Sequence, residues 1–330
     1  MSTLLATVML AALTVYALGA GADFGGGVWD LLAAGPRAGK QRALIEQAIG
    51  PIWEANHVWL ILVVVLLFAG FPTAYAAASV ALHVPLTLML LGMVLRGSAF
   101  VFRHYSAGEN VDDARAQLRW GRVFAVASTI TPIFLGVVMG AVTAGIRFSG
   151  GVPEAGFFGA WLGAFPFAVG LFALTLFAFL AAVYLTNECE GALREDFRAR
   201  ALGAGVAVGV MALACVLAVG ARAPEFRRAL TGSWWSWPLQ LATAAVAVGA
   251  LASLWVRHFA AARILAALQV VLILAGWGAA QRPYLIAPAF TIESAAAPPA
   301  TLAALLWALG VGSVTLFPSL AWLYRVFKRR

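Results

Sequence analysis

Nine stretches of about 20 predominantly apolar residues divide this chain of 330 residues. A helix needs about 20 such residues to cross the hydrocarbon core of a bilayer, because each residue advances it by about 1.5 Å. Hydrophobic residues make up 63% of the chain and charged residues only 11%, against about 25% charged residues in soluble domains. The sequence therefore predicts an all-α polytopic membrane protein and excludes a soluble globular one.

We expect a single membrane domain over residues 1–330, arranged as two four-helix bundles plus one peripheral helix. The first apolar run is interpreted as a span rather than a cleaved signal segment, because no basic residue precedes Arg37. Pro72 lies inside the second run, where we expect it to kink the helix. The predicted spans are 3–22, 53–75, 79–102, 123–144, 161–185, 201–221, 237–256, 261–279 and 301–323.

The basic residues are divided unequally between alternate loops. With nine spans and the N-terminus outside, sixteen Lys and Arg residues fall in inner segments and five in outer loops, while Arg96 lies within a span. An excess of this kind marks the cytoplasmic side of membrane proteins. We predict a periplasmic N-terminus and a cytoplasmic C-terminus. Since the basic residues are dispersed in short clusters between spans, the net charge of +8 does not indicate nucleic-acid binding.

Three ionisable residues, Asp23, Glu54 and Arg96, lie within or at the ends of the first three predicted spans. Charged groups inside a bilayer are costly, so each is a candidate for function. Because successive spans run in opposite directions, all three are expected at a similar depth near the cytoplasmic face. Two interpretations stay open: a buried charge network that fixes helix packing, or a proton relay through Glu54 whose pKa is set by Asp23 or Arg96.

His57 follows Glu54 by three positions and shares a helix face with it, so the two side chains could pair or pass a proton. Haem ligation by this chain is not expected, because His57 and His83 are predicted near opposite sides of the membrane. The two cysteines, Cys189 and Cys215, form no metal-binding motif. The fingerprints of soluble enzymes are absent from the sequence as well.

Two further patterns concern packing and partners. The densely charged segment 186–200 is interpreted as a solvated helix end, with a docking surface for a partner subunit as the alternative. Small residues four apart allow helices to approach closely. The pairs expected to do so are Gly136/Gly140, Gly159/Gly163 and Gly205/Gly209.

Several sequence blocks together point to a known family. The blocks are residues 21–27 (GADFGGG), 53–59 (WEANHVW), 95–103 (LRGSAFVFR) and 184–188 (YLTNE). The chain resembles subunit II of the cytochrome bd-type quinol oxidases, and the block at 53–59 is closer to the cyanide-insensitive branch. The resemblance is dense over residues 20–103 and mainly topological in the C-terminal half.

The resemblance implies a bacterial inner-membrane complex that oxidises quinol and reduces dioxygen to water. Haems b and d would belong to the larger partner, subunit I, and this chain would bind none. It would scaffold subunit I in a heterodimer and contribute to proton uptake from the cytoplasm; a bound quinone and small accessory subunits are left open. The residues implicated are the relay candidates Glu54, Asp23 and His57, the charge partner Arg96, and the subunit-contact candidates Trp53, Asn56 and Trp59.

One departure from the family pattern affects the expected proton path. Val101 stands where this branch is expected to have an acid, so the role would pass to Glu54 or to the inner-loop acids Glu109, Asp112 and Asp113. Two other functions remain as alternatives. One is a proton-coupled secondary transporter with Asp23, Glu54 and Arg96 as its substrate site, and the other is a passive assembly scaffold.

Overall fold

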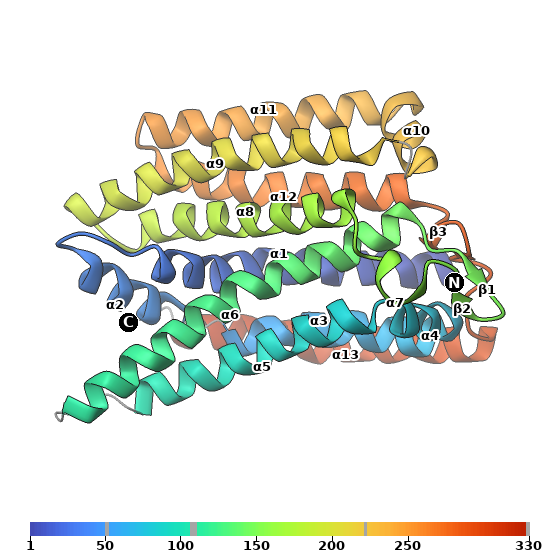
Figure 1. Ribbon diagram of the computed structural model, residues 1–330, viewed down its shortest axis with the longest axis horizontal. Coiled ribbons are helices and arrows are strands. Elements are labelled where there is room, and N and C mark those ends of the chain that lie inside the picture. The colour runs from blue at the N-terminus through green and yellow to red at the C-terminus, as the bar shows by residue number, and fades with distance from the viewer. Residues whose placement is uncertain (50–52, 106–110, 221–222, 328–330) are drawn as a thin grey trace.

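The computed structural model describes residues 1–49, 53–105, 111–220 and 223–327. Long helices run side by side along one axis, and the connecting segments gather at the two ends of the molecule (Figure 1). The elements are α1 (Ser2–Leu31), α2 (Ala38–Ile49), α3 (Trp53–Gly70), α4 (Pro72–Ala81), α5 (His83–Tyr105), α6 (Val111–Ala144), β1 (Phe148–Ser149), β2 (Val152–Pro153), α7 (Gly156–Gly159), α8 (Ala164–Asn187), α9 (Gly191–Val219), α10 (Pro224–Gly232), α11 (Ser236–Trp255), α12 (Phe259–Gln281), β3 (Tyr284–Ile286), β4 (Phe290–Thr291) and α13 (Pro299–Phe327).

The membrane-spanning character predicted from the sequence is confirmed. Within the described ranges, 8 helices are long and apolar enough to cross a bilayer, and a ninth crossing is obtained if the bent pair α3–α4 counts as one span. The prediction that Pro72 kinks the span 53–75 is confirmed, and the bend is sharp enough to divide the span into two helices. The chain turns by 115° between Gly70 and Pro72, and Pro72 begins α4. Proline is well placed there, because the first residues of a helix have no intrahelical acceptor for their N–H groups.

Three helices extend well beyond their predicted bounds. Helix α1 continues from residue 22 to Leu31, α6 begins at Val111 rather than at 123, and α9 begins at Gly191 rather than at 201. Hydropathy locates the apolar core of a span, whereas backbone hydrogen bonding carries a helix into the polar region beyond it. Because α1 continues to Leu31, Asp23 lies eight residues inside the helix rather than at its end. The extension is buried almost throughout.

The helices form two groups, as predicted. The first contains α1, α3, α5 and α6, and the second contains α8, α9, α11 and α12; α6 and α1 both pack against α8 and join the two groups. Helix α13 is peripheral and packs against α3 and α1 (Figure 1). Helix α1 contacts members of both groups and is therefore the central element of the fold.

Two short hairpins close the end of the molecule at which the N-terminus lies (Figure 1). Strands β1 and β2 pair antiparallel with Phe148 opposite Pro153, and β3 pairs antiparallel with β4. The Ile146 amide donates a hydrogen bond to the Ala287 carbonyl at 2.7 Å and so links the segments that carry the two hairpins.

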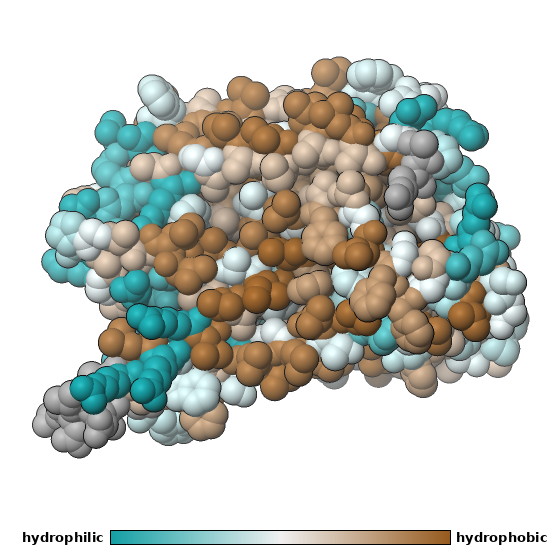
Figure 2. Space-filling model, viewed as in Figure 1, coloured by the Kyte–Doolittle hydropathy of each residue, from teal (hydrophilic) through white to brown (hydrophobic). Residues whose placement is uncertain are grey.

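The surface is arranged as a membrane protein requires. Hydrophobic side chains cover the middle of the visible face, and hydrophilic ones gather at its two ends (Figure 2). Large apolar side chains such as Leu217 and Val314 are each 73% exposed. In water so many exposed apolar groups would cause aggregation, whereas lipid or a partner subunit can cover them. The chain is a multi-pass membrane protein.

The small-residue pairs differ in their contacts. A Cβ placed on Gly136 would lie 2.6 Å from the Val169 carbonyl oxygen, and one on Gly140 would lie 2.7 Å from the Pro166 Cα, so this pair sets the close approach of α6 and α8. Of the predicted pair Gly205/Gly209, only Gly205 meets a neighbour, and nothing described lies within 4 Å of a Cβ on Gly209. The packing prediction is confirmed for the first pair, whereas no described residue approaches Gly209.

We therefore expect Gly136→Ala to destabilise the protein by roughly 1–3 kcal/mol, because the added methyl meets backbone that cannot move aside. Gly209→Ala is the matched control, since its methyl meets open space and alanine favours the helix. The thermal unfolding midpoints of the two purified variants measure the difference. Equal midpoints would show that the α6–α8 approach is not tight.

Candidate functional site

A buried ion pair joins α1 to α5 inside the first helix group. The Arg96 Nη2 donates a hydrogen bond to the Asp23 Oδ1, and the two side chains are 1% and 0% exposed. Both residues were expected at one depth, and the contact places them there. Unpaired charges at such a position are very unfavourable, so each residue makes the other tolerable.

Aromatic rings enclose the arginine. The Arg96 guanidinium carbon lies 5.0 Å from the ring centres of both Phe24 and Phe124, which belong to α1 and α6. Contacts of a cation with ring faces are strongest where water is excluded. Phe24 also stacks on the ring of His57 of α3 and on that of Phe177 of α8, with ring centres 6.4 Å apart in each case. His57 therefore stands beside the ion pair, with Phe24 between them.

Glycines of α1 allow three helices to reach the pair. A Cβ on any of them would overlap a neighbouring helix, because α1 is surrounded on several sides. The close contacts explain why glycine stands at these positions of a helix, although glycine disfavours helices. The contacts are Gly19 with Asn56 of α3, Gly21 and Gly25 with Leu180 and Phe177 of α8, and Gly27 with Ser128 of α6.

Near the pair lie buried polar side-chain atoms that have no hydrogen-bond partner among the described residues. Leaving such a group buried without a partner costs about 1–3 kcal/mol, so a concentration of them needs an explanation. They offer free hydrogen-bonding capacity around one ion pair, which is a property that proton transfer requires. The unpartnered atoms belong to Tyr16 (Oη), Asp23 (Oδ2), Asn56 (Oδ1 and Nδ2), His57 (Nδ1), Arg96 (Nε and Nη1) and Ser128 (Oγ).

The residues predicted from the block at 53–59 fall into different environments. Asn56 is 3% exposed within this chain and lies close to Asp23, but outside hydrogen-bonding geometry. Trp59 is half-buried and packs on the chain's own core. The backbone of Trp53 and Glu54 begins α3, and their side chains lie outside the described part of the structure.

A second charged group lies further along the same two helices. Arg103 of α5 contacts Asp30 of α1 and Glu46 of α2, each at 3.3 Å. Asp30 and Arg103 are each seven residues beyond Asp23 and Arg96, so the two contacts repeat along the helix pair. Val101, two residues before Arg103, is 37% exposed in this chain. The inner-loop acids Glu109, Asp112 and Asp113 lie outside the described side chains.

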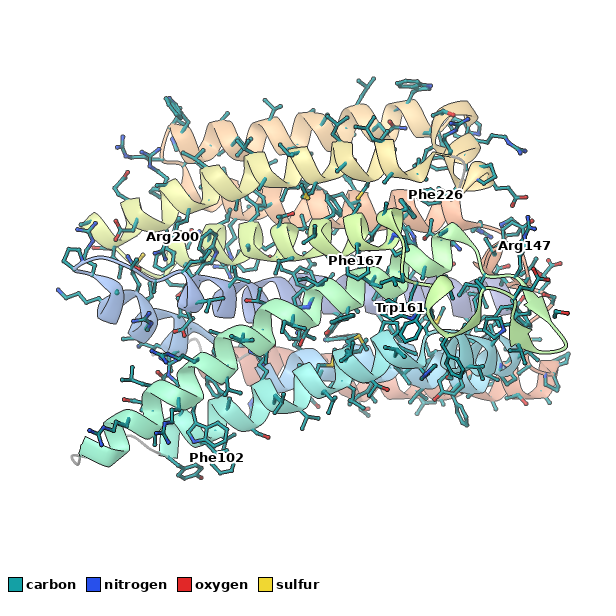
Figure 3. All side chains as sticks on the ribbon, in the orientation of Figure 1. Phe102, Arg147, Trp161, Phe167, Arg200 and Phe226 are labelled. Atoms are coloured by element: carbon teal, nitrogen blue, oxygen red, sulfur yellow. The ribbon has the colours of Figure 1, made fainter. Side chains whose placement is uncertain are left out.

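Helix α2 is fixed to α9 by polar contacts at this end. Arg37 donates to both carboxylate oxygens of Asp196 at 2.7 and 2.5 Å, and this hydrogen bonding raises the pKa of the Arg37 guanidinium above its ordinary value. Gln41 bridges Asp196 at 3.0 Å and Arg200 at 2.7 Å. Arg200 lies among the ends of α1, α8 and α9, and Arg147 lies at the opposite end of the molecule (Figure 3). Much of the charge in segment 186–200 is thus used within the chain.

His57 and His83 are too far apart to bracket one haem iron. His57 lies near the start of α3 against Phe24, whereas His83 begins α5 at the opposite end, where its ring is 5.1 Å from Phe157. They cannot face each other across one iron. Among the described residues, no group of three or more His, Cys, Asp and Glu side chains could hold a metal ion.

Sequence reasoning missed several residues of this region. The predicted spans end before Asp30 and Arg103, no pattern singles out Glu46, and Tyr16 and Ser128 lie within spans without a distinguishing feature. A usable signal was present in the repeated spacing of seven, which puts an acid at 23 and 30 and an arginine at 96 and 103. Residues seven apart share a helix face, provided that the helix continues through both positions.

Comparison with known proteins agrees with this architecture. The family described as "Cytochrome bd terminal oxidase subunit II" matches residues 1–327. The chain is 24% identical over 327 residues to the Bacillus subtilis (strain 168) protein named "Putative cytochrome bd menaquinol oxidase subunit II", covering 96% of this chain and 92% of that protein. It is 29% identical over 167 residues to the Escherichia coli (strain K12) "Cytochrome bd-I ubiquinol oxidase subunit 2", covering 49% of this chain and 42% of that one.

A solved structure has the same fold. The bd oxidase of Geobacillus thermodenitrificans contains a chain that superposes with a TM-score of 0.81 at 23% identity, covering 99% of this chain and 98% of that chain. The fold and the buried charges define a polytopic subunit of a membrane complex. The chain belongs to the cytochrome bd terminal oxidase subunit II family. It is a subunit of a quinol oxidase, an oxidoreductase complex that it forms with subunit I, and the alternative of a secondary transporter finds no support.

The burial of the ion pair leads to a stability prediction. Arg96→Met leaves Asp23 buried and unpaired, so we expect a loss of about 3–5 kcal/mol. The double variant Asp23→Leu/Arg96→Met removes both charges and should be clearly more stable than the single one. Thermal unfolding of the purified complexes provides the comparison. A double variant no more stable than Arg96→Met would show that the two charges are not energetically coupled.

Proposed function

We propose that this subunit scaffolds subunit I in a single membrane domain and conducts protons from the cytoplasm toward the site of dioxygen reduction in the bacterial inner membrane. The relay residues are Asp23, Glu54 and His57, and Arg96 is their charge partner. The observation that carries the proposal is the buried Asp23–Arg96 pair with free polar atoms around it.

The excess of basic residues supports placing the α2 end of the molecule in the cytoplasm. Helices α1, α5, α8, α11 and α13 end there, and helices α2, α6, α9 and α12 begin there (Figure 1). The N-terminus is then periplasmic and the C-terminus cytoplasmic. Protons entering at the α2 end reach Asp23 after about 12 Å of helix, given eight residues at about 1.5 Å each.

The haems b and d are assigned to subunit I, and this chain is proposed to bind no haem, because His57 and His83 do not face each other. Trp53, Asn56 and Trp59 are the candidate contacts to subunit I. We assign no binding site for a quinone and no contact with an accessory subunit to this chain. Quinol, dioxygen and lipid are the remaining partners.

The relay predicts the behaviour of Glu54→Gln in the assembled oxidase. Glutamine keeps the shape of the side chain but cannot carry a proton, so oxygen consumption with excess quinol should fall roughly tenfold or more while the haem content stays unchanged. Glu54→Asp should recover part of the rate. The matched control is Glu188→Gln, whose carboxylate is half-exposed and pairs with Arg263 at 3.7 Å. Unchanged turnover of Glu54→Gln would remove this residue from the path.

A further inference from the structure

The two ion pairs of α1 and α5 form a ladder. Each joins residues 73 positions apart, Asp23 with Arg96 and Asp30 with Arg103. Helices α1 and α5 run in the same direction, from the N-terminal end of the molecule toward the α2 end (Figure 1). Seven residues correspond to about 10 Å of helix, so the second pair lies about 10 Å closer to the α2 end than the first.

Exposure increases along this ladder toward the α2 end. The side chain of Asp23 is 0% exposed, that of Asp30 is 4% and that of Glu46 is 28%. The three carboxylates thus extend from the interior of the bundle to its surface. Glu46 and Asp30 are connected through the one guanidinium of Arg103, which both contact.

Two carboxylates that share one arginine can hold a proton without leaving an uncompensated charge. When either Glu46 or Asp30 is protonated, the other still balances Arg103. The charged groups acting on Asp30 from the neighbouring elements are Arg103 of α5 and Arg42 and Glu46 of α2. The contacts of 3.3 Å are also long for charge-assisted hydrogen bonds, so the carboxylates are not tightly held.

A hydroxyl group lies between the two pairs. Gly27 is four residues after Asp23 and three before Asp30, and all three therefore lie on one face of α1. A Cβ on Gly27 would overlap the Cβ and Oγ of Ser128, so this serine occupies the space beside Gly27. Its Oγ is fully buried and has no hydrogen-bond partner among the described residues. A hydroxyl can donate and accept at once, which suits it to passing a proton.

We propose that Glu46, Arg103 and Asp30 form the cytoplasmic mouth of the proton path and that Ser128 links this mouth to Asp23. A proton taken up by Glu46 is exchanged to Asp30 beside Arg103. Ser128 then accepts a proton from the Asp30 side as its own proton passes to Asp23, so that the hydroxyl is restored and no charge remains on it. This inference rests on the proposed function, because it supplies the inlet of the same path.

The test uses the assembled oxidase with Glu46→Gln, Asp30→Asn and Ser128→Ala as separate variants. The readout is the rate of proton uptake when the reduced complex meets oxygen, followed with a pH-indicator dye, together with the haem content. We expect each variant to slow proton uptake at least fivefold at unchanged haem content, and Glu46→Asp to recover part of the rate. Thr129→Ala is the matched control, because its hydroxyl donates to the Ala125 carbonyl of its own helix at 2.8 Å.

Ser128→Ala separates transfer from packing, since it removes a hydroxyl that makes no hydrogen bond to any described residue. If Glu54→Gln slows proton uptake while Glu46→Gln and Ser128→Ala do not, the inlet proposed here is overturned and the proposed function stands. If none of these variants slows uptake, both are overturned. If Thr129→Ala slows uptake as much as Ser128→Ala, the effect belongs to the packing of α6, and the role of Ser128 is overturned.

Discussion

The ion pair between Asp23 and Arg96 is the interaction on which the first helix group depends. Moving either charge alone into the bundle would cost several kcal/mol, and the cost is offset only when both are held together and further contacts are made. The structure supplies these contacts through the rings of Phe24 and Phe124 on either side of the guanidinium. Helices α1, α5 and α6 must therefore meet at one point and at one depth.

The central position of α1 follows from the same requirement. Its glycines allow α3, α6 and α8 to approach closely enough to enclose the pair, and its extension to Leu31 brings Asp30 to Arg103. The second helix group contains no comparable ion pair among the described residues of its spans; its charged contacts lie at the α2 end, as between Arg257 and Glu195 at 2.9 Å. Among the described residues, the fully buried ion pair within a span thus belongs to the first helix group.

Much of this fold could be predicted from hydropathy, because the lipid environment forces each apolar run into a helix. The bend between Gly70 and Pro72 and the extension of α1 were not predictable in that way: a glycine-rich segment containing Asp23 reads as a loop unless its partners are known. Asp23 and Arg96 were found because charges in spans are rare. Asp30, Glu46 and Ser128 were missed because their roles depend on register and packing, and a buried serine in a span usually hydrogen-bonds its own helix.

The central claim is that the membrane-buried carboxyl group of Asp23 gains and loses a proton during turnover. Infrared difference spectroscopy of the assembled oxidase, between its reduced and oxidised states, tests this directly. We predict a carbonyl band of a protonated carboxylic acid that shifts in heavy water and that is displaced in the Asp23→Glu variant, which keeps the charge pair with Arg96. Identical carboxyl bands in the wild-type and Asp23→Glu complexes would contradict the account and leave the ion pair a structural element only.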